Sequence, residues 1–308
     1  MELLYFSRSY YLAFYIIHEG DVQTLKKSLF SLMLKLKKTH IVVQSEPIEI
    51  VYLVSTQLES HDIPHAFSTR KGGVSLFPQN SLNMSFREDE PKRVHENQKR
   101  FLQALQLQDK SILTAHQTHS DVSVILDSTF KPETKLNADA LILEGSSVYL
   151  IGVNVADCLP ILLAHPGKRI VCAIHAGWRG TAQRITEKTV LKLSQEFKIN
   201  PAELIGAIGP GACRDCYEVG EEVREMFPDK KRQELIFKPS MRPKHYLLDL
   251  QKANLLQFEK TGIPAKNIDT DLYCTIHHND LFFSHRKEGP QSKENKTGRF
   301  LGVIGVEN

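Results

Sequence analysis

Cys158-Leu-Pro-Ile-Leu-Leu-Ala-His-Pro-Gly-Lys-Arg-Ile-Val-Cys-Ala-Ile-His175 is the stretch with the strongest structural signal in this chain. An apolar run, a Pro166-Gly167 turn signal and a second apolar run rich in β-branched residues predict a β-hairpin. With the turn centred on Pro166-Gly167, Ala164 pairs with Arg169 and Cys158 lies opposite His175. Directly opposed residues have Cβ atoms about 4.5–5.5 Å apart. At that distance a thiolate and an imidazole can share a metal ion or act as a nucleophile and its base.

Outward from this hairpin, short apolar strands alternate with helical segments, and no internal repeat or Gly/Ser linker divides the chain. Acidic residues ahead of Pro91 are typical of a helix start, and Gly262 is typical of a helix end. The pattern predicts an α/β (mixed α+β) fold, a single-domain layered sandwich of mixed sheets flanked by helices. The predicted strands are Ile50–Val54, Ser123–Leu126, Ala140–Leu143, Val148–Val155, Ile161–Ala164, Ile170–Ile174, Leu204–Ile208 and Leu301–Ile304. The predicted helices are Lys92–Leu105, Thr181–Phe197, Gly220–Phe227 and Leu248–Lys260.

The first 40 residues differ from the rest. Residues 1–17 are apolar and aromatic, but Arg8 interrupts them, and the uninterrupted apolar piece is far shorter than the about 20 residues that span a bilayer. We therefore expect no stable membrane insertion. We expect residues 1–40 to form a poorly ordered N-terminal extension, with a short amphipathic helix over Leu25–Lys38. The main domain is expected to cover residues 41–308.

The composition is that of an ordinary globular protein. The 308 residues are 41% hydrophobic and 24% charged, and the net charge is only +3. Because basic and acidic residues are interspersed, the chain lacks the basic patch that a nucleic-acid polymer would require of its partner. Five cysteines are an odd count and favour reduced thiols in the cytoplasm over a secreted disulfide framework. The sequence leaves a monomer and a homodimer equally open.

Three short clusters carry the residues with chemical potential: Ala115–Ser120, Ala156–Pro160 and His175–Gly180. They can supply two histidines and one cysteine, and three ligands with an open fourth position are the catalytic form of a zinc site. The strand–Gly–helix junction after His175 also presents backbone amides that can hold an anion. Taken singly, each of these residues is equally compatible with a plain core role.

Three further motifs allow two readings each. Arg70, in the Gly-rich loop Thr69–Gly73, suits a phosphate or a carboxylate, but it also suits a plain turn with a solvated arginine. Cys213-Arg-Asp-Cys216 has CxxC spacing, yet no second CxxC pair accompanies it, so we interpret it as structural. His277-His278 is a weaker ligand candidate, and we interpret it as a loop pair.

The chain resembles the multicopper polyphenol oxidoreductase (laccase-domain) family, whose better-supported activity is purine nucleoside phosphorolysis and deamination. The resemblance runs from about residue 60 to residue 305 in the expected order. The stretches that carry it are Phe67–Ser75, Ser81–Met84, Gln117–His119, Ala138–Ala140, Ala156–Pro160, His175–Gly180, Ile208–Pro210, Cys216–Val219, Tyr246–Asp249, Asp280–Ser284 and Thr297–Arg299.

The resemblance implies a zinc site made by His119, Cys158 and His175. Arg70, and with it Arg179, would bind the substrate or phosphate. Asp157, beside the ligand Cys158, would act as an acid/base group or support the ligand. These implications make Asp157 and Cys158 the predicted catalytic residues and Zn²⁺ the predicted cofactor, with copper as the second choice.

The implied function is a zinc-dependent purine nucleoside phosphorylase. Its substrates would be phosphate and a small purine nucleoside: adenosine, inosine or S-methyl-5'-thioadenosine. A zinc-bound water would add adenosine deaminase activity. The alternatives are a metal-free Cys-His hydrolase or deamidase with Cys158 as nucleophile and His175 as base, a peptidoglycan-precursor editing hydrolase, and a copper polyphenol oxidase. The oxidase would need many histidines in His-x-His pairs, and the sequence has no such pair.

Overall fold

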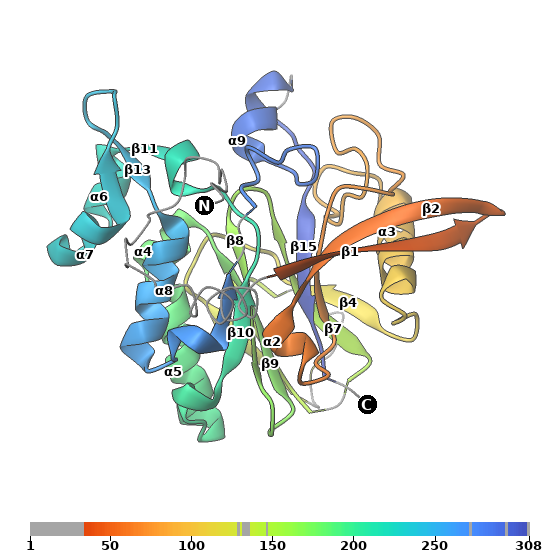
Figure 1. The fold of residues 1–308 in the computed structure, drawn as a ribbon, viewed down its shortest axis with the longest axis horizontal. Helices are drawn as coiled ribbons and strands as arrows, with labels where there is room; N and C mark the ends of the chain where they lie inside the picture. The colour runs from red at the N-terminus through yellow and green to blue at the C-terminus, as the bar shows by residue number, and fades with distance from the viewer. Residues whose placement is uncertain are drawn as a thin grey trace, which may run out of the picture. The chain divides into compact units, whose positions relative to one another are not determined.

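The computed structural model describes residues 34–127, 130, 136–145, 147–270, 273–292 and 295–306. Within unit Leu32–Asn308, two six-stranded mixed sheets pack face to face (Figure 1). In spatial order, the first sheet contains β1 (Leu34–Val43), β2 (Glu46–Ser55), β3 (His65–Ser68), β15 (Phe300–Ile304), β7 (Tyr149–Val155) and β4 (Ser111–Thr114). The second contains β14 (Ile268–Thr270), β10 (Ile205–Ile208), β8 (Leu159–His165), β9 (Ile170–Ala176), β6 (Ala140–Glu144) and β5 (Ser123–Leu126). The predicted mixed α/β sandwich is confirmed.

Helices cover the outer faces of the two sheets. The helix α3 (Pro91–Ala104) packs on the first sheet, and α4 (Trp178–Ala182), α5 (Ile185–Phe197) and α8 (Leu250–Thr261) pack on the second. A small sheet of β11 (Glu218–Gly220), β13 (His245–Leu248) and β12 (Phe237–Pro239) lies beside α6 (Glu221–Glu225) and α7 (Lys230–Ile236) (Figure 1). The other helices of the described residues are α2 (Thr56–Glu59), α9 (His285–Glu288) and four short 3-10 helices at Pro201–Glu203, Arg214–Cys216, Ala265–Asn267 and Gly289–Gln291. No helix within the described ranges combines the length and apolar character needed to cross a membrane.

The central hairpin is buried on both faces. In β8, Ile161 and Leu163 face the helices, whereas Leu162 and Ala164 face the other sheet. Because successive side chains of a strand point to opposite faces, a strand buried on both faces has a continuous apolar sequence. This explains why β8 and β9 produce the strongest signal in the sequence.

The register of this hairpin corrects the prediction. The hairpin itself forms, but Ala164 pairs with Val171 instead of Arg169, and Pro160 instead of Cys158 lies opposite His175. All of Pro166–Arg169 belongs to the turn, where Arg169 has a left-handed φ of 48°. The shift of two residues keeps Cys158 and His175 on the same face, because the side-chain period of a strand is two.

Two predicted helices also need correction. The predicted helix Thr181–Phe197 is broken into α4 and α5 at Arg184, whose φ is 65°. Residues 34–38 of the predicted helix Leu25–Lys38 lie in β1, which pairs with β2 along its whole length. Cross-strand pairing has therefore overridden the helical spacing of the leucines, and the domain sheet begins before residue 41. The rest of the predictions for residues 1–33 lies outside the described residues.

Candidate active site

Three side chains from separate segments meet where the two sheets end. His119 follows β4 of the first sheet, Cys158 lies in the crossing from β7 to β8, and His175 lies in β9. Their ligand atoms all lie within 4.8 Å of one another. The imidazoles of the two histidines have ring centroids 4.8 Å apart at an interplanar angle of 69°. The three residues implied by the resemblance are thus brought together from both sheets.

Asp139 organises this cluster, and the sequence analysis did not single it out. Its carboxylate accepts hydrogen bonds from the backbone N–H groups of Thr118, His119 and Ser120 at 3.1, 3.0 and 2.7 Å. It also accepts one from His175 Nδ1 at 2.8 Å, which leaves Nε2 of that ring for a metal ion. A carboxylate that fixes the tautomer of a metal-binding histidine is the usual partner in such sites. In the sequence, the position of the acidic Asp139 directly before a buried strand is the feature that could have indicated this role.

The cluster is strongly coupled electrostatically. Burial acts to raise the pKa of Cys158, but the charge of His175 and hydrogen bonds from both histidines lower it to about 6. Burial acts to lower the pKa of His175, but the Cys158 thiolate and Asp139 raise it to about 9. Burial likewise opposes ionisation of Asp139, yet hydrogen bonds from His175 and Ser120 hold its pKa below the usual range. The Cys158 thiolate and the His175 imidazolium thus each favour the charged form of the other.

The space between the ligands is kept open by Gly177. A Cβ atom at this position would lie 2.9 Å from Cys158 Sγ and 3.0 Å from His119 Nδ1. The backbone of Gly177 is ordinary, with φ of −79°, so its conformation does not require glycine. One thiolate and two imidazoles around a space that excludes even a methyl group fit Zn²⁺, which binds these donors at about 2.0–2.3 Å.

A cavity of about 750 Å³ opens in front of the three ligands. Its lining includes Asp157, Arg179 and Tyr217, none of which is a member of the cluster. The guanidinium of Arg179 lies over the ring of Trp178 at 4.3 Å and has no hydrogen bond or ion pair with any described residue. Cavities of 300–1,000 Å³ are typical of small-molecule sites.

Both carboxylate oxygens of Asp157 are engaged by the protein. Oδ1 accepts a hydrogen bond from Thr275 Oγ1 at 2.7 Å, and Oδ2 accepts one from the backbone N–H of Arg286 at 2.6 Å. Asp157 is buried and has a left-handed φ of 84°. These contacts hold the backbone next to Cys158, so the geometry gives Asp157 a positioning role.

Arg70 lies away from this cavity. Its guanidinium donates to the carbonyl oxygen of Asn279 at 2.8 Å, pairs with Glu288 at 2.8 Å and also donates to the carbonyl of Asn80 at 2.7 Å. It stacks on Phe283 at 4.5 Å. Because protein groups occupy these donors and the side chain is only 12% exposed, Arg70 ties loops together in this structure.

Two other residues on the cavity wall carry buried polar atoms without a partner among the described residues. They are His285, through Nδ1, and Asn154, through Oδ1. A buried polar atom left unpaired costs about 1–3 kcal/mol. Neither residue was identified as a site residue from the sequence, because their roles depend on which way the folded backbone turns them.

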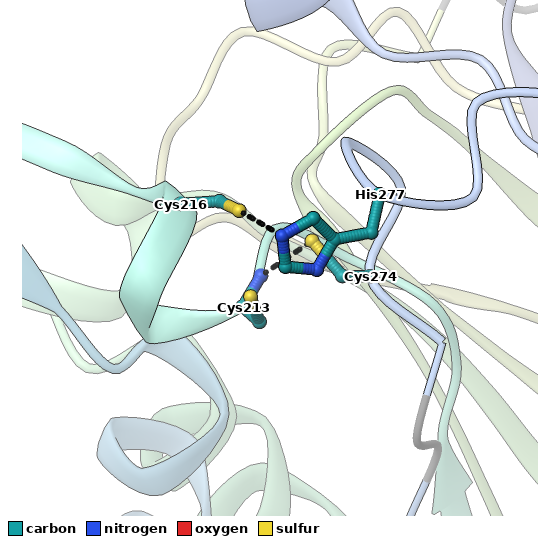
Figure 2. A group of neighbouring side chains, drawn as sticks. All are labelled: Cys213, Cys216, Cys274 and His277. Carbon is teal, nitrogen blue, oxygen red and sulfur yellow. Dashed lines mark hydrogen bonds between the residues drawn. The ribbon is translucent and has the colours of Figure 1, made fainter. Parts of the chain in front are cut away.

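A second cluster joins the CxxC motif to distant residues. Cys213, Cys216, Cys274 and His277 have ligand atoms that all lie within 4.8 Å of one another (Figure 2). His277 does lie in a turn, as the interpretation of a loop pair predicts, and its imidazole also lies among three thiols, so the CxxC motif has a second pair of possible donors. This second pair has the pattern Cys-x-x-His and lies about 60 residues away in the sequence, so the absence of a second CxxC motif did not exclude it.

The chain is similar to a known family and to several known proteins. The model of the family described as multi-copper polyphenol oxidoreductase laccase matches residues 64–307. A purine nucleoside phosphorylase of Deinococcus radiodurans is 34% identical over 248 residues, which cover 79% of this chain and 89% of that protein. Adenosine deaminase RL5, from an unknown prokaryotic organism, is 31% identical over 245 residues, covering 76% and 92%. The crystal structure of YlmD from Geobacillus stearothermophilus has a TM-score of 0.74 at 27% identity, covering 87% of this chain and 100% of that chain.

Proposed function

The chain belongs to the multi-copper polyphenol oxidoreductase laccase family, and we propose that it is a zinc-dependent purine nucleoside phosphorylase. The observation that carries this proposal is the cluster of His119, Cys158 and His175 at the wall of a cavity of about 750 Å³. Three donors hold a zinc ion and leave a position open toward a substrate. When bound, the ion supplies a Lewis acid that polarises oxygen ligands and acidifies water. The same three donors could hold copper, which is the second choice of metal.

The substrates we propose are phosphate and a purine nucleoside, either adenosine, inosine or S-methyl-5'-thioadenosine. In phosphorolysis a phosphate oxygen forms a bond to C1′ of the ribose while the C1′–N9 bond breaks, and the base leaves with the bonding electrons. The residues must therefore hold an anion beneath the sugar and stabilise an oxocarbenium-like centre. Cys158 and Asp157 lie on the cavity wall, with Asp157 fixing the backbone next to Cys158.

Arg179 is the residue we propose for phosphate. Two other arginines on the cavity wall donate to backbone carbonyl oxygens, Arg286 to that of Glu218 at 2.7 Å and Arg299 to that of Thr297 at 2.7 Å. A third, Arg87, pairs with the carboxylate of its neighbour Glu88 at 3.5 Å. Arg179 keeps its planar donors available and lies at the strand–Gly–helix junction that follows His175. Guanidinium groups bind phosphate through two parallel hydrogen bonds.

The unpaired atoms of His285 and Asn154 support a polar ligand in the same cavity. Burial lowers the pKa of His285, so the ring is neutral at pH 7 and can exchange hydrogen bonds with a base or a ribose hydroxyl. The name of the relative RL5 supports deamination of adenosine as a second activity. The low pKa of Cys158 favours a Cys-His hydrolase as the alternative.

Product analysis tests the proposal. Purified protein is incubated with each nucleoside, with and without phosphate, and the base and sugar products are identified. Free base and ribose 1-phosphate that form only with phosphate support phosphorolysis, and inosine formed from adenosine without phosphate supports deamination. Cys158→Ala should abolish zinc binding at this site and all turnover, whereas Cys172→Ala, at a buried thiol outside both clusters, should not. Turnover of a nucleoside by metal-free protein would exclude the zinc-dependent mechanism.

A further inference from the structure

We propose that Cys213, Cys216, Cys274 and His277 bind a second zinc ion whose role is to hold the fold around the active site. We call these four residues the Cys3His cluster. Their ligand atoms all lie within 4.8 Å of one another, although the two pairs are about 60 residues apart in the sequence (Figure 2). Three thiolates and one imidazole form a closed donor set that is typical of structural zinc.

The sheet topology explains how the two pairs meet. The strands β10 and β14 are parallel neighbours, with Ile208 paired to Thr270. Parallel strands end at the same edge of a sheet, so the segments that follow them emerge side by side. The backbone continues this pairing through a parallel bridge between Gly211 and Cys274, where the N–H of Thr275 donates to the carbonyl of Gly211 at 3.0 Å. Each segment then supplies two donors with two residues between them.

Contacts within the cluster already orient the donors. Cys216 Sγ lies 3.1 Å from His277 Nε2, and the backbone N–H of Cys213 donates to Cys274 Sγ at 3.3 Å. A backbone amide that donates to a sulfur favours its thiolate, which is the form that binds metal. All of these thiols are free in the structure.

The position of the cluster indicates a supporting role and not a catalytic one. The four donors fill a tetrahedral shell and leave no place for a substrate. The segments that they join both hold Asp157: the N–H of Ala212 donates to its carbonyl at 2.9 Å, and Thr275 Oγ1 donates to its carboxylate at 2.7 Å. Asp157 precedes Cys158, and Tyr217, on the cavity wall, follows Cys216. A metal ion here would thus fix one wall of the active site.

Metal stoichiometry tests this proposal directly. Wild-type protein should contain two zinc ions per chain after dialysis against metal-free buffer, as measured by inductively coupled plasma mass spectrometry. His277→Ala and Cys158→Ala should each contain one, and Cys158→Ala combined with Cys274→Ser should contain none. His278→Ala is the matched control, because this neighbouring imidazole lies outside the cluster, and it should retain two. His277→Cys should restore the second ion, because a fourth thiolate also completes a tetrahedral zinc shell.

Cobalt provides a second readout, because its absorption reports thiolate ligands of the bound ion directly. Wild-type protein reconstituted with Co²⁺ should show intense thiolate-to-metal absorption, most of which remains in Cys158→Ala and disappears in His277→Ala. One ion per chain in the wild type, lost in Cys158→Ala and unaffected by His277→Ala, would overturn the proposal. A disulfide between Cys213 and Cys216 in freshly purified reduced protein would also overturn it. Absence of the second ion alone would still leave one ion on His119, Cys158 and His175, so the two proposals fail separately.

Discussion

Replacement of Gly177 by alanine should damage the metal site while leaving the fold intact. The added Cβ would lie 2.9 Å from Cys158 Sγ and 3.0 Å from His119 Nδ1. Non-bonded heavy atoms prefer about 3.5–4.0 Å, so the ligand atoms must retreat by about 0.5–1 Å. Zinc ligands tolerate deviations of only about 0.2 Å from ideal bond lengths. One of the two ligands is therefore lost or badly placed.

The expected loss of zinc affinity is at least about 10–100-fold, which is the usual effect of disturbing only the partner of a ligand. The backbone of Gly177, at φ −79° and ψ 172°, is open to any residue. Metal-free Gly177→Ala should therefore remain folded, with a loss of stability of at most about 1–3 kcal/mol from the crowding of the new Cβ against Cys158 and His119.

The assay is a zinc titration of metal-free protein in competition with a chelating dye, together with thermal unfolding. It is made in a His277→Ala background, so that the Cys3His cluster does not contribute. Gly167→Ala is the matched control, because a Cβ there would meet nothing closer than 3.6 Å. Wild-type zinc affinity in Gly177→Ala would refute the three-ligand arrangement. If Gly177→Ala lowered the stability by the same amount with and without zinc, the substitution would act through the fold and not through the metal site.

The remaining predictions concern the partners of this site and one buried histidine. Asp139→Asn should weaken zinc binding by about 10–100-fold, since the His175 ring loses its anionic partner; an unchanged titration would refute this role. Arg179→Ala should reduce phosphate-dependent kcat/KM by about 10–150-fold, the equivalent of about 1.5–3 kcal/mol for one charge-assisted contact. Arg70→Ala should lower stability and leave the KM for phosphate unchanged, because its donors bind the protein; the reverse pattern would restore Arg70 as the phosphate ligand. Burial lowers the pKa of His65 to about 4, and its Nε2 accepts a hydrogen bond from the backbone N–H of Ser55 at 2.7 Å. Since the unfolded ring protonates near pH 6.5, this contribution is fully present above pH 6.5 and is lost as the pH falls toward 4, by up to about 3 kcal/mol. Denaturant unfolding at several pH values should show that His65→Gln reduces this loss.

The sequence alone determined the features that depend on neighbours along the chain. Continuous apolar runs predicted β7, β8 and β9, because strands buried on both faces must be apolar throughout. Gly262 predicted the end of α8, where its φ is 89°. The motifs around His119, Cys158 and His175 predicted the family and a set of metal ligands, since each motif is local and ordered along the chain.

The tertiary structure decided everything that depends on register and on distant pairing. The turn at Pro166–Arg169 moved the partner of His175 by two residues, because turn length sets hairpin register and the sequence does not state that length. The sequence is compatible with Arg70 as an anion ligand, but in the folded chain the Arg70 guanidinium pairs with Glu288, which is distant in the sequence. The Cys3His cluster exists only because β10 and β14 are parallel neighbours, and no spacing along the chain contains that fact. Local chemistry is thus present in the sequence, whereas the meeting of segments is fixed by sheet order.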